Sequence, residues 1–347
     1  MKPPASTEAR KSRHLDICLE DDVASFRRTG FDGVRLHHEA LPEFALDDVE
    51  TATQFLGHGL RAPLVISSMT GGTARAGTIN RNLAVAAEAA GVALALGSQR
   101  AALENGTLTD TYDVRRVAPN VVLFANLGAV QLNYGVTPSD AQRAVETIRA
   151  NGLYLHLNPL QEALQNGGDT NFRDLAAKIE AVVKRLPVPV LIKSVGSGIA
   201  VNTAQRLFSL GVAAIETAGA GGTSWARVEG KRAGGQRERI AETFGSWGYP
   251  TVEATSALRK AFPQATIVAS GGVRSGIDVA KALALGASAA GIALPFLAPA
   301  SRSAQAVRDL IDEYVTGLRI AMFASGSQTI ADLARALYVR GADDTLT

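Results

Sequence analysis

The chain has 347 residues, of which 46% are hydrophobic and 20% charged, and its formal net charge is +2. This apolar content is enough for a large core and excludes a disordered chain. The near-neutral charge, with basic clusters that are short and contain few aromatic residues, argues against nucleic-acid binding.

Cys18 is the only cysteine, which excludes an intrachain disulfide and a thiolate metal cage and favours a reducing compartment. The N-terminal stretch is basic, but no apolar run follows it, and no segment approaches the ~20 apolar residues of a membrane helix. We therefore expect a cytoplasmic protein that does not associate with membranes. The composition permits a homo-oligomer, which we also expect.

Residues 1–60 predict an arm with turns and short strands but without a core of its own. From residue 60 onward, short β-branched apolar runs alternate with longer segments of helical periodicity, which is typical of βα units. Eight runs predict strands, at 63–67, 92–96, 121–125, 153–157, 188–192, 212–216, 266–269 and 289–293. Segments between them predict helices, at 78–90, 141–150, 174–185, 203–210 and 277–285.

Eight such units predict an α/β fold, a TIM (β/α)₈ barrel with an N-terminal extension and an insertion after strand 6. A doubly wound open sheet is the alternative. Residues 217–265 separate the sixth and seventh strands, a length typical of a mobile lid or an interface insertion. We assign one domain, 1–347, with the arm at 1–60, the barrel core at 61–300 and C-terminal helices at 301–347. Residues 303–326 predict a long amphipathic helix pair whose apolar positions seal the barrel, and binding of a partner is the alternative.

Polar and glycine-rich motifs follow nearly every predicted strand. In chain order they are SMTGG, GSQR, NLG, HLNPLQE, KSVGSG, TAGAGGTSW and SGGVRSG. The carboxyl ends of the strands meet on one rim of a parallel barrel, where the reacting groups lie. The sequence therefore predicts a single active face.

The loop after the seventh strand predicts a phosphate cup. Gly271 and Gly272 lack side chains, so backbone amides can approach an anion, and Arg274 adds positive charge. The following helix directs its N-terminal dipole at the same point, and Ala293 and Leu294 offer further amides from the eighth unit. A tight turn that binds nothing is the alternative.

Lys193 ends a buried apolar strand, where an unpaired ammonium would cost several kcal/mol. A ligand partner would explain it, since a lysine beside the N1/C2 edge of a flavin stabilises the anionic reduced ring. A structural ion pair and a Schiff base are the alternatives.

His156 and Asn158 are spaced to face the barrel mouth together, although His156 alone also fits a core histidine. Glu162 supplies one carboxylate, and a diphosphate substrate would complete a Mg²⁺ site around it. His37, His38 and Glu39 lack metal-protease spacing and are expected on the surface. Cys18 has no activating pattern nearby.

The motifs as a set resemble the type 2 isopentenyl-diphosphate isomerases. From about residue 10 to residue 300 they are RKSRH, HEALPE, SSMTGG, GSQR, HLNPLQE, GDTNF, KSVGSG, GAGGTSW, WGYPT and SGGVRSGIDVAKALALGA. The resemblance implies interconversion of isopentenyl and dimethylallyl diphosphate in isoprenoid biosynthesis. It also implies bound FMN, active when reduced by NADPH or another reductant, and Mg²⁺. Ser194 departs from the KEVG pattern common in that family.

The resemblance further implies the site residues. FMN would be bound by Ser68, Met69, Thr70, Ser98, Asn126, Lys193, Thr223, Gly271, Gly272, Arg274, Ala293 and Leu294. The substrate diphosphate would be bound by Arg10, Lys11, Ser98, Gln99, Arg100, His156, Asn158 and Gln161, and Glu162 would hold Mg²⁺. Gln161, Lys193 and His156 are expected to be catalytic, with Gln161 relaying or positioning a proton and flavin N5 supplying one.

Two other functions compete with the isomerase. An FMN-dependent hydroxy-acid oxidase uses a similar barrel, but it needs a His base with paired Arg residues, and the rim at the seventh strand offers no convincing pair. A non-catalytic flavin- or phosphate-binding module would share the cup alone. Moving a double bond instead requires a strong acid in a dry site that stabilises a carbocation-like transition state.

Overall fold

The computed structural model describes residues 7–338 and contains a closed parallel barrel of eight strands. Around the barrel these are β4 (Leu64–Ile66), β5 (Ala93–Ala95), β6 (Leu123–Gly128), β7 (Gly152–His156), β8 (Val190–Lys193), β9 (Ala214–Glu216), β10 (Thr266–Ser270) and β11 (Ala289–Ile292). Because β11 pairs with β4, the sheet is closed and the open-sheet alternative is wrong. All eight predicted strands are confirmed. Residues 1–6 of the predicted arm and 339–347 of the predicted C-terminal region lie outside the described residues.

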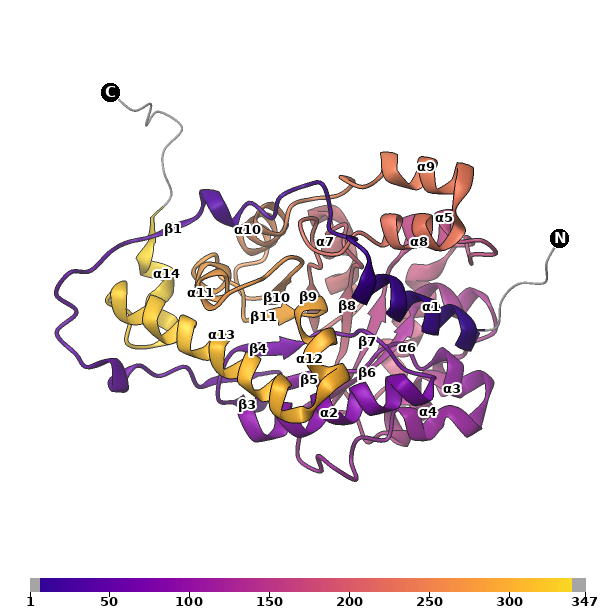
Figure 1. Ribbon diagram of the computed structural model, residues 1–347, viewed down its shortest axis with the longest axis horizontal. Coiled ribbons are helices and arrows are strands. Elements are labelled where there is room, and N and C mark those ends of the chain that lie inside the picture. Colours follow the sequence, from indigo (N-terminus) through magenta and orange to yellow (C-terminus); the bar gives the residue numbers. More distant parts are fainter. Residues whose placement is uncertain (1–6, 339–347) are drawn as a thin grey trace.

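Helices surround the barrel (Figure 1). The five predicted helices are confirmed with shifted ends, as α2 (Ala74–Ala90), α4 (Pro138–Thr147), α6 (Leu175–Arg185), α7 (Val201–Ser209) and α11 (Gly276–Ala284). α2 begins early because the Thr73 side chain caps it by accepting from the Ala76 amide. Shorter or later helices are α3 (Arg100–Glu104), α5 (Pro159–Leu164), α10 (Thr251–Ala261), α12 (Leu297–Arg302) and α14 (Leu333–Ala336).

A hairpin in the arm closes the amino end of the barrel. Its strands, β2 (Thr53–Phe55) and β3 (His58–Leu60), are antiparallel. Phe55 and Leu60 join the apolar cluster formed by the inward-facing strand residues. The Phe55 and Phe124 rings pack edge to face with their centroids 5.9 Å apart. The centroids of Phe124 and Tyr154 are 5.6 Å apart in the same arrangement. The polar rim at the other end therefore lies above a layer of packed apolar side chains.

The C-terminal region does not seal the barrel, so that expectation is wrong. Residues 303–326 contain one long helix rather than a pair, α13 (Ala304–Ala324), which packs outside the barrel against α2 and α11. Its buried residues repeat every three or four positions, at Val307, Ile311, Tyr314, Leu318 and Met322. Such a stripe fits a groove between two helices rather than a barrel end. Beyond α13, β12 (Leu337–Tyr338) pairs with β1 (Arg35–Leu36) of the arm.

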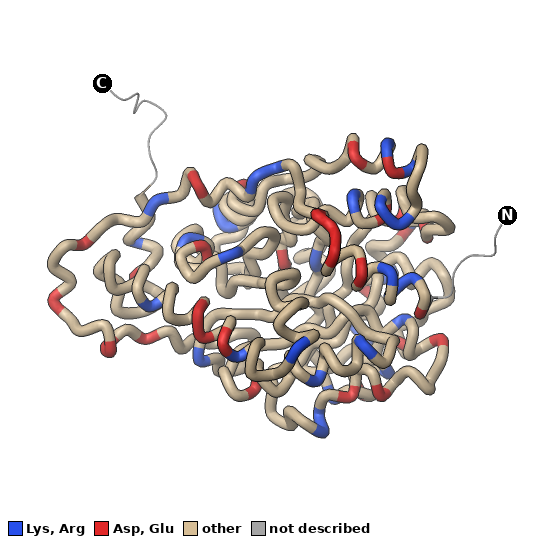
Figure 2. The backbone as a smooth tube through the Cα atoms, in the orientation of Figure 1, with Lys and Arg blue, Asp and Glu red and all other residues tan. Residues whose placement is uncertain are grey.

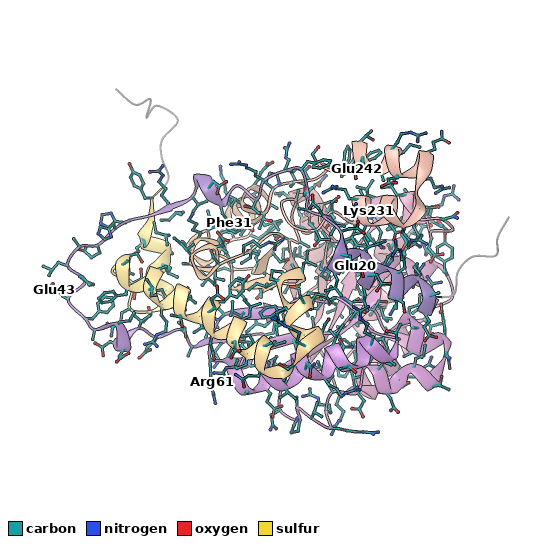
Figure 3. The ribbon with its side chains drawn as sticks, in the orientation of Figure 1. Glu20, Phe31, Glu43, Arg61, Lys231 and Glu242 are labelled. Carbon is teal, nitrogen blue, oxygen red and sulfur yellow. The ribbon has the colours of Figure 1, made fainter. Side chains whose placement is uncertain are left out.

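A helix that the sequence did not predict, α1 (Thr7–Glu20), lies at the carboxyl end of the barrel beside the insertion. The insertion forms three helices, α8 (Trp225–Ala233), α9 (Gly235–Thr243) and α10, rather than a loop. Lys231 on α8 pairs with Asp21 at 3.1 Å, and Figure 3 shows Lys231 close to Glu20 at this end, opposite Glu43 at the tip of the arm. This ion pair thus joins the arm to the insertion, where α1 packs against α8.

Lys and Arg are interspersed with Asp and Glu over the face drawn in Figure 2. His37 and His38 are exposed, as expected, and residues 7–338 contain no group of three His, Cys, Asp or Glu side chains suited to a metal. Within the same range, no helix is both long and apolar enough to span a membrane.

Candidate active site

The loops at the carboxyl ends of the strands and the helix α1 surround one cavity of about 250 Å³. Every residue assigned above to the flavin, the substrate or the metal lines it, with one exception. Gln99 is buried away from the cavity, where its amide donates to the Ala144 carbonyl at 2.9 Å. Gln99 therefore ties the loop after β5 to α4, and its assignment to the substrate stays a prediction that the cavity lining does not support.

The predicted phosphate cup is formed by the loops after β10 and β11. Gly271 and Gly272 have φ values of 107° and 79°, and a Cβ on either would lie within 2.4 Å of a backbone oxygen of Gly219 or Gly221. The turn alone thus requires both glycines. The anion site is supported separately, because Arg274 lines the same cavity and α11 begins next to it.

Asn126 connects two polar groups at the rim. Its Nδ2 donates to Ser68 Oγ at 3.0 Å, and its Oδ1 lies 2.9 Å from His156 Nδ1. Burial, together with the charges of Lys193 and Lys11, lowers the pKa of His156 to about 3. The imidazole is therefore neutral at physiological pH, with Nδ1–H donated to Asn126 and Nε2 left as an acceptor.

Lys193 lies at the end of β8, where its Nζ donates to the Ser194 carbonyl at 2.7 Å. Burial lowers its pKa, and the neighbouring Glu216 carboxylate opposes that shift. Glu216, which the sequence analysis overlooked, accepts from Ser67 Oγ at 2.7 Å and Ser270 Oγ at 2.8 Å. A lone carboxylate in the apolar sixth strand was the available signal. Lys193 thus belongs to a buried network of opposite charge.

Glu162 is held by three donors. Asn158 Nδ2 donates to Oε1 at 2.8 Å, and Oε2 accepts from Gln165 Nε2 at 3.2 Å and from the Asp169 amide at 2.7 Å. Burial raises its pKa. A carboxylate accepts about four hydrogen bonds, so one lone pair remains for a cation.

Gln161 has a fixed amide orientation. Its Oε1 accepts from Asn158 at 3.1 Å, and its Nε2 donates to Glu229 at 3.1 Å. Glu229 on α8 also contacts His14 Nε2 at 3.0 Å and Arg232 Nε at 2.7 Å. Although burial alone would raise the pKa of Glu229, His14 and Arg232 hold it at about 2. Glu229 is therefore ionised at physiological pH and accepts the hydrogen bond of the Gln161 amide.

The sequence analysis missed Glu229 because it drew only mobility from the insertion. It also missed His14 within the RKSRH motif. Arg10, Lys11 and His14 share a face of α1 because residues four apart lie one turn apart. That spacing was a usable signal.

The basic groups of the rim lie near Glu162, because Arg10 interacts with its charge and Arg100 pairs with the neighbouring Asp169. Arg10 and Lys11 reach the cavity from α1, and Arg100 pairs with Glu104 and Asp169, each at 2.6 Å. Burial, with the neighbouring Arg10 charge, lowers the pKa of Lys11 to about 7. The cavity is therefore lined by basic side chains of α1 at one place and by the glycine turn with Arg274 at another.

Comparisons with known proteins agree with this geometry. The sequence profile of the FMN-dependent dehydrogenase family matches residues 132–340. Isopentenyl-diphosphate delta-isomerases of Nostoc sp. and Synechococcus sp. are 46% and 48% identical, covering 96% and 95% of this chain and 97% and 96% of theirs. The one from Stutzerimonas stutzeri is 49% identical over 95% of this chain and 96% of its own.

Solved structures share the fold at lower identity. A mandelate oxidase variant with an FMN adduct has a TM-score of 0.63 at 19% identity, covering 97% of this chain and 93% of its own. A lactate oxidase of Pediococcus acidilactici has a TM-score of 0.68 at 17% identity, covering 94% and 87%.

Proposed function

Since the chain belongs to the isopentenyl-diphosphate delta-isomerases, we propose that it interconverts isopentenyl and dimethylallyl diphosphate with reduced FMN and Mg²⁺. The observation that carries this proposal is the pairing of two anion-binding regions within one cavity. A flavin mononucleotide and a diphosphate substrate each bring phosphate to such a site. A module that binds flavin alone would have no use for the second region.

The residues present fit FMN. The glycine cup excludes side chains, while Arg274 and the start of α11 offer positive charge to a phosphate. Ser68, Asn126 and Lys193 supply polar groups for the ring edge, with Met69, Thr70, Ser98, Thr223, Ala293 and Leu294 completing the lining. Bound reduced FMN would supply the proton at N5 and an electron-rich face beside the alkene.

The substrate diphosphate fits the opposite wall. Arg10, Lys11 and Arg100 provide charge, and Ser98, His156 and Asn158 provide hydrogen-bonding groups. Glu162 would hold Mg²⁺ through its remaining lone pair, with phosphate oxygens as further ligands, because Mg²⁺ commonly takes one or two carboxylates plus substrate phosphates.

Gln161 and Glu229 are suited to proton positioning. The Glu229 carboxylate fixes the Gln161 amide, which leaves the Gln161 oxygen facing Asn158 and the cavity. Neutral His156 offers Nε2 as an acceptor rather than a positive charge. Residues of α1 line the cavity beside these groups, and exclusion of water once substrate is bound would strengthen electrostatic stabilisation within the site.

The decisive experiment is an anaerobic incubation of the protein with reduced FMN, Mg²⁺ and isopentenyl diphosphate in D₂O. We expect dimethylallyl diphosphate and deuterium in the product. Retention of FMN without either would refute the isomerase. The related oxidase folds make a hydroxy-acid oxidase the competing activity, yet the loop at 270–276 contains no histidine to serve as its base. Lactate and mandelate should therefore not bleach the oxidised flavin.

Three further features accompany this proposal. NADPH or another reductant would reduce the flavin, since the isomerisation itself transfers no electrons. A single cysteine supports a reducing, cytoplasmic location. A homo-oligomer is the proposed assembly, testable by light scattering of the FMN-loaded protein.

A further inference from the structure

Tyr112 lies outside the cavity but joins one of its basic residues. It follows the 3₁₀ helix η3 (Gly106–Thr111), and it is fully buried. Its hydroxyl donates to the Ser98 carbonyl at 2.6 Å. The Lys11 ammonium donates to the same carbonyl at 2.7 Å and to the Tyr112 hydroxyl at 2.8 Å. The three groups form a closed triangle in which each donor has an acceptor.

The triangle uses two of the three N–H donors of the ammonium. Lys11 also lines the cavity, so the third donor is available to a ligand. The two acceptors lie on the same side of the ammonium, so they restrict its rotation and leave the third N–H bond on the other side. A lysine on a surface helix would instead sample many orientations.

The loop after β4 is shaped around this pair. A Cβ on Gly71 would lie 2.0 Å from the Tyr112 ring, and one on Gly72 would lie 3.2 Å from the hydroxyl and 3.3 Å from Lys11 Nζ. The Gly72 amide donates to Thr111 Oγ1 at 2.9 Å, which fixes the residue before Tyr112. Tyr112 therefore occupies a rigid slot.

Holding an ammonium here has an electrostatic cost. Lys11 is partly buried next to Arg10 and Arg100, whose charges disfavour its protonated form, while Glu104 favours it. Hydrogen-bond acceptors stabilise the charged form of an amine. The Tyr112 oxygen and the Ser98 carbonyl supply two such acceptors without adding a negative charge that would repel a diphosphate.

We propose that Tyr112 is a positioning residue of the diphosphate site, whose hydroxyl holds the Lys11 ammonium against the Ser98 carbonyl so that its third N–H bond faces a phosphate oxygen. The identity of the substrate rests on the proposed function. Recognition of a diphosphate by this triangle does not rest on the proposed function, because it can be measured without catalysis.

The test is Tyr112→Phe in the FMN-loaded protein, which keeps the ring and removes the hydroxyl. We expect the Kd for inorganic diphosphate with Mg²⁺, measured by calorimetry, to rise about tenfold, as loss of a hydrogen bond to a charged group implies. The KM for isopentenyl diphosphate should rise similarly while kcat stays within about twofold. The basic limb of kcat/KM should move to lower pH, because the ammonium has lost an acceptor.

Two controls separate positioning from packing. Adding Tyr112→Phe to Lys11→Met should change diphosphate affinity no further, since the amine is already absent. Tyr134→Phe removes a hydroxyl that accepts from the Asn171 amide at 3.0 Å, and it should leave the affinity and the pH profile unchanged.

The outcomes distinguish the two proposals. Suppose that the wild type isomerises isopentenyl diphosphate, and that Tyr112→Phe has the same Kd for diphosphate and the same pH profile as the wild type. This result would overturn the positioning role and leave the isomerase assignment intact. Diphosphate binding without isomerisation would refute the isomerase, yet the tenfold change would still support positioning. Should the variant unfold, the native protein decides by nuclear magnetic resonance. A slowly exchanging Lys11 ammonium signal that shifts with diphosphate supports the proposal, and a rapidly exchanging one overturns it.

Discussion

Gln161 on α5 donates its amide to Glu229 on α8 across 3.1 Å, which joins a barrel loop to the insertion after the sixth strand. The orientation of Gln161 therefore depends on a carboxylate whose pKa is held at about 2. Replacing the Glu229 carboxylate would leave the Gln161 amide free to rotate.

We predict that Glu229→Gln lowers kcat for isopentenyl diphosphate about 100-fold, the scale of one proton-transfer contribution. The substrate KM and the Kd for FMN should change less than threefold, because neither phosphate region contains Glu229. Steady-state kinetics and flavin fluorescence titration measure these quantities. Glu238→Gln, on exposed α9, is the matched control. A kcat equal to that of the wild type would remove Glu229 from the proton-positioning group.

Glu162→Gln removes the carboxylate assigned to Mg²⁺ and leaves a side chain of similar size. We expect the Mg²⁺ concentration that gives half-maximal activity to rise at least tenfold, while FMN binding is unaffected. The measurement is a Mg²⁺ titration of initial rate at saturating substrate. An unchanged titration curve would mean that the metal, if required, binds elsewhere.

Gly271→Ala should cost FMN affinity beyond its backbone strain. The added Cβ would lie 2.2 Å from the Gly219 carbonyl oxygen, so the loop after β10 must shift. Gly135→Ala is a matched control, because Gly135 has a similar φ of 96° but no atom within 4 Å of an added Cβ. Each variant should lose about 1 to 2 kcal/mol from the left-handed backbone alone. In Gly271→Ala, the Kd for FMN should also rise more than tenfold, and equal affinities in the two variants would argue against the cup.

The pH dependence of kcat/KM should follow Lys11. Its pKa of about 7 lies below the usual lysine value, so the free enzyme loses this positive charge as pH rises through 7. We therefore expect kcat/KM to fall above pH 7, while kcat holds to higher pH because a bound diphosphate favours the ammonium. Lys11→Arg should abolish the fall at pH 7, even with lower activity. Lys178→Arg, whose native amine donates to the Leu132 carbonyl, should retain it.

The barrel could be predicted from sequence because each strand is a short apolar run between a helix and a polar motif. Most site residues could be placed because they follow those runs directly. Other contacts depend on long-range packing. Gln161 and Glu229 are 68 positions apart, and Lys11 and Tyr112 are 101 apart, so no local pattern joins them. Helix α1 was missed because few of its residues are buried, as at Leu15 and Ile17.

The hairpin β2–β3 has a consequence for the kinetics of the enzyme. Phe55 and Leu60 fill one end of the barrel, so ligands can reach the cavity only from the other end. FMN and the diphosphate substrate would therefore share one entrance. Helix α1 lies at that end, and its Arg10 and Lys11, which line the cavity, are proposed to bind the diphosphate. We therefore expect ordered binding, in which FMN binds before the diphosphate substrate and the bound substrate hinders FMN release. Flavin exchange should slow as substrate is added.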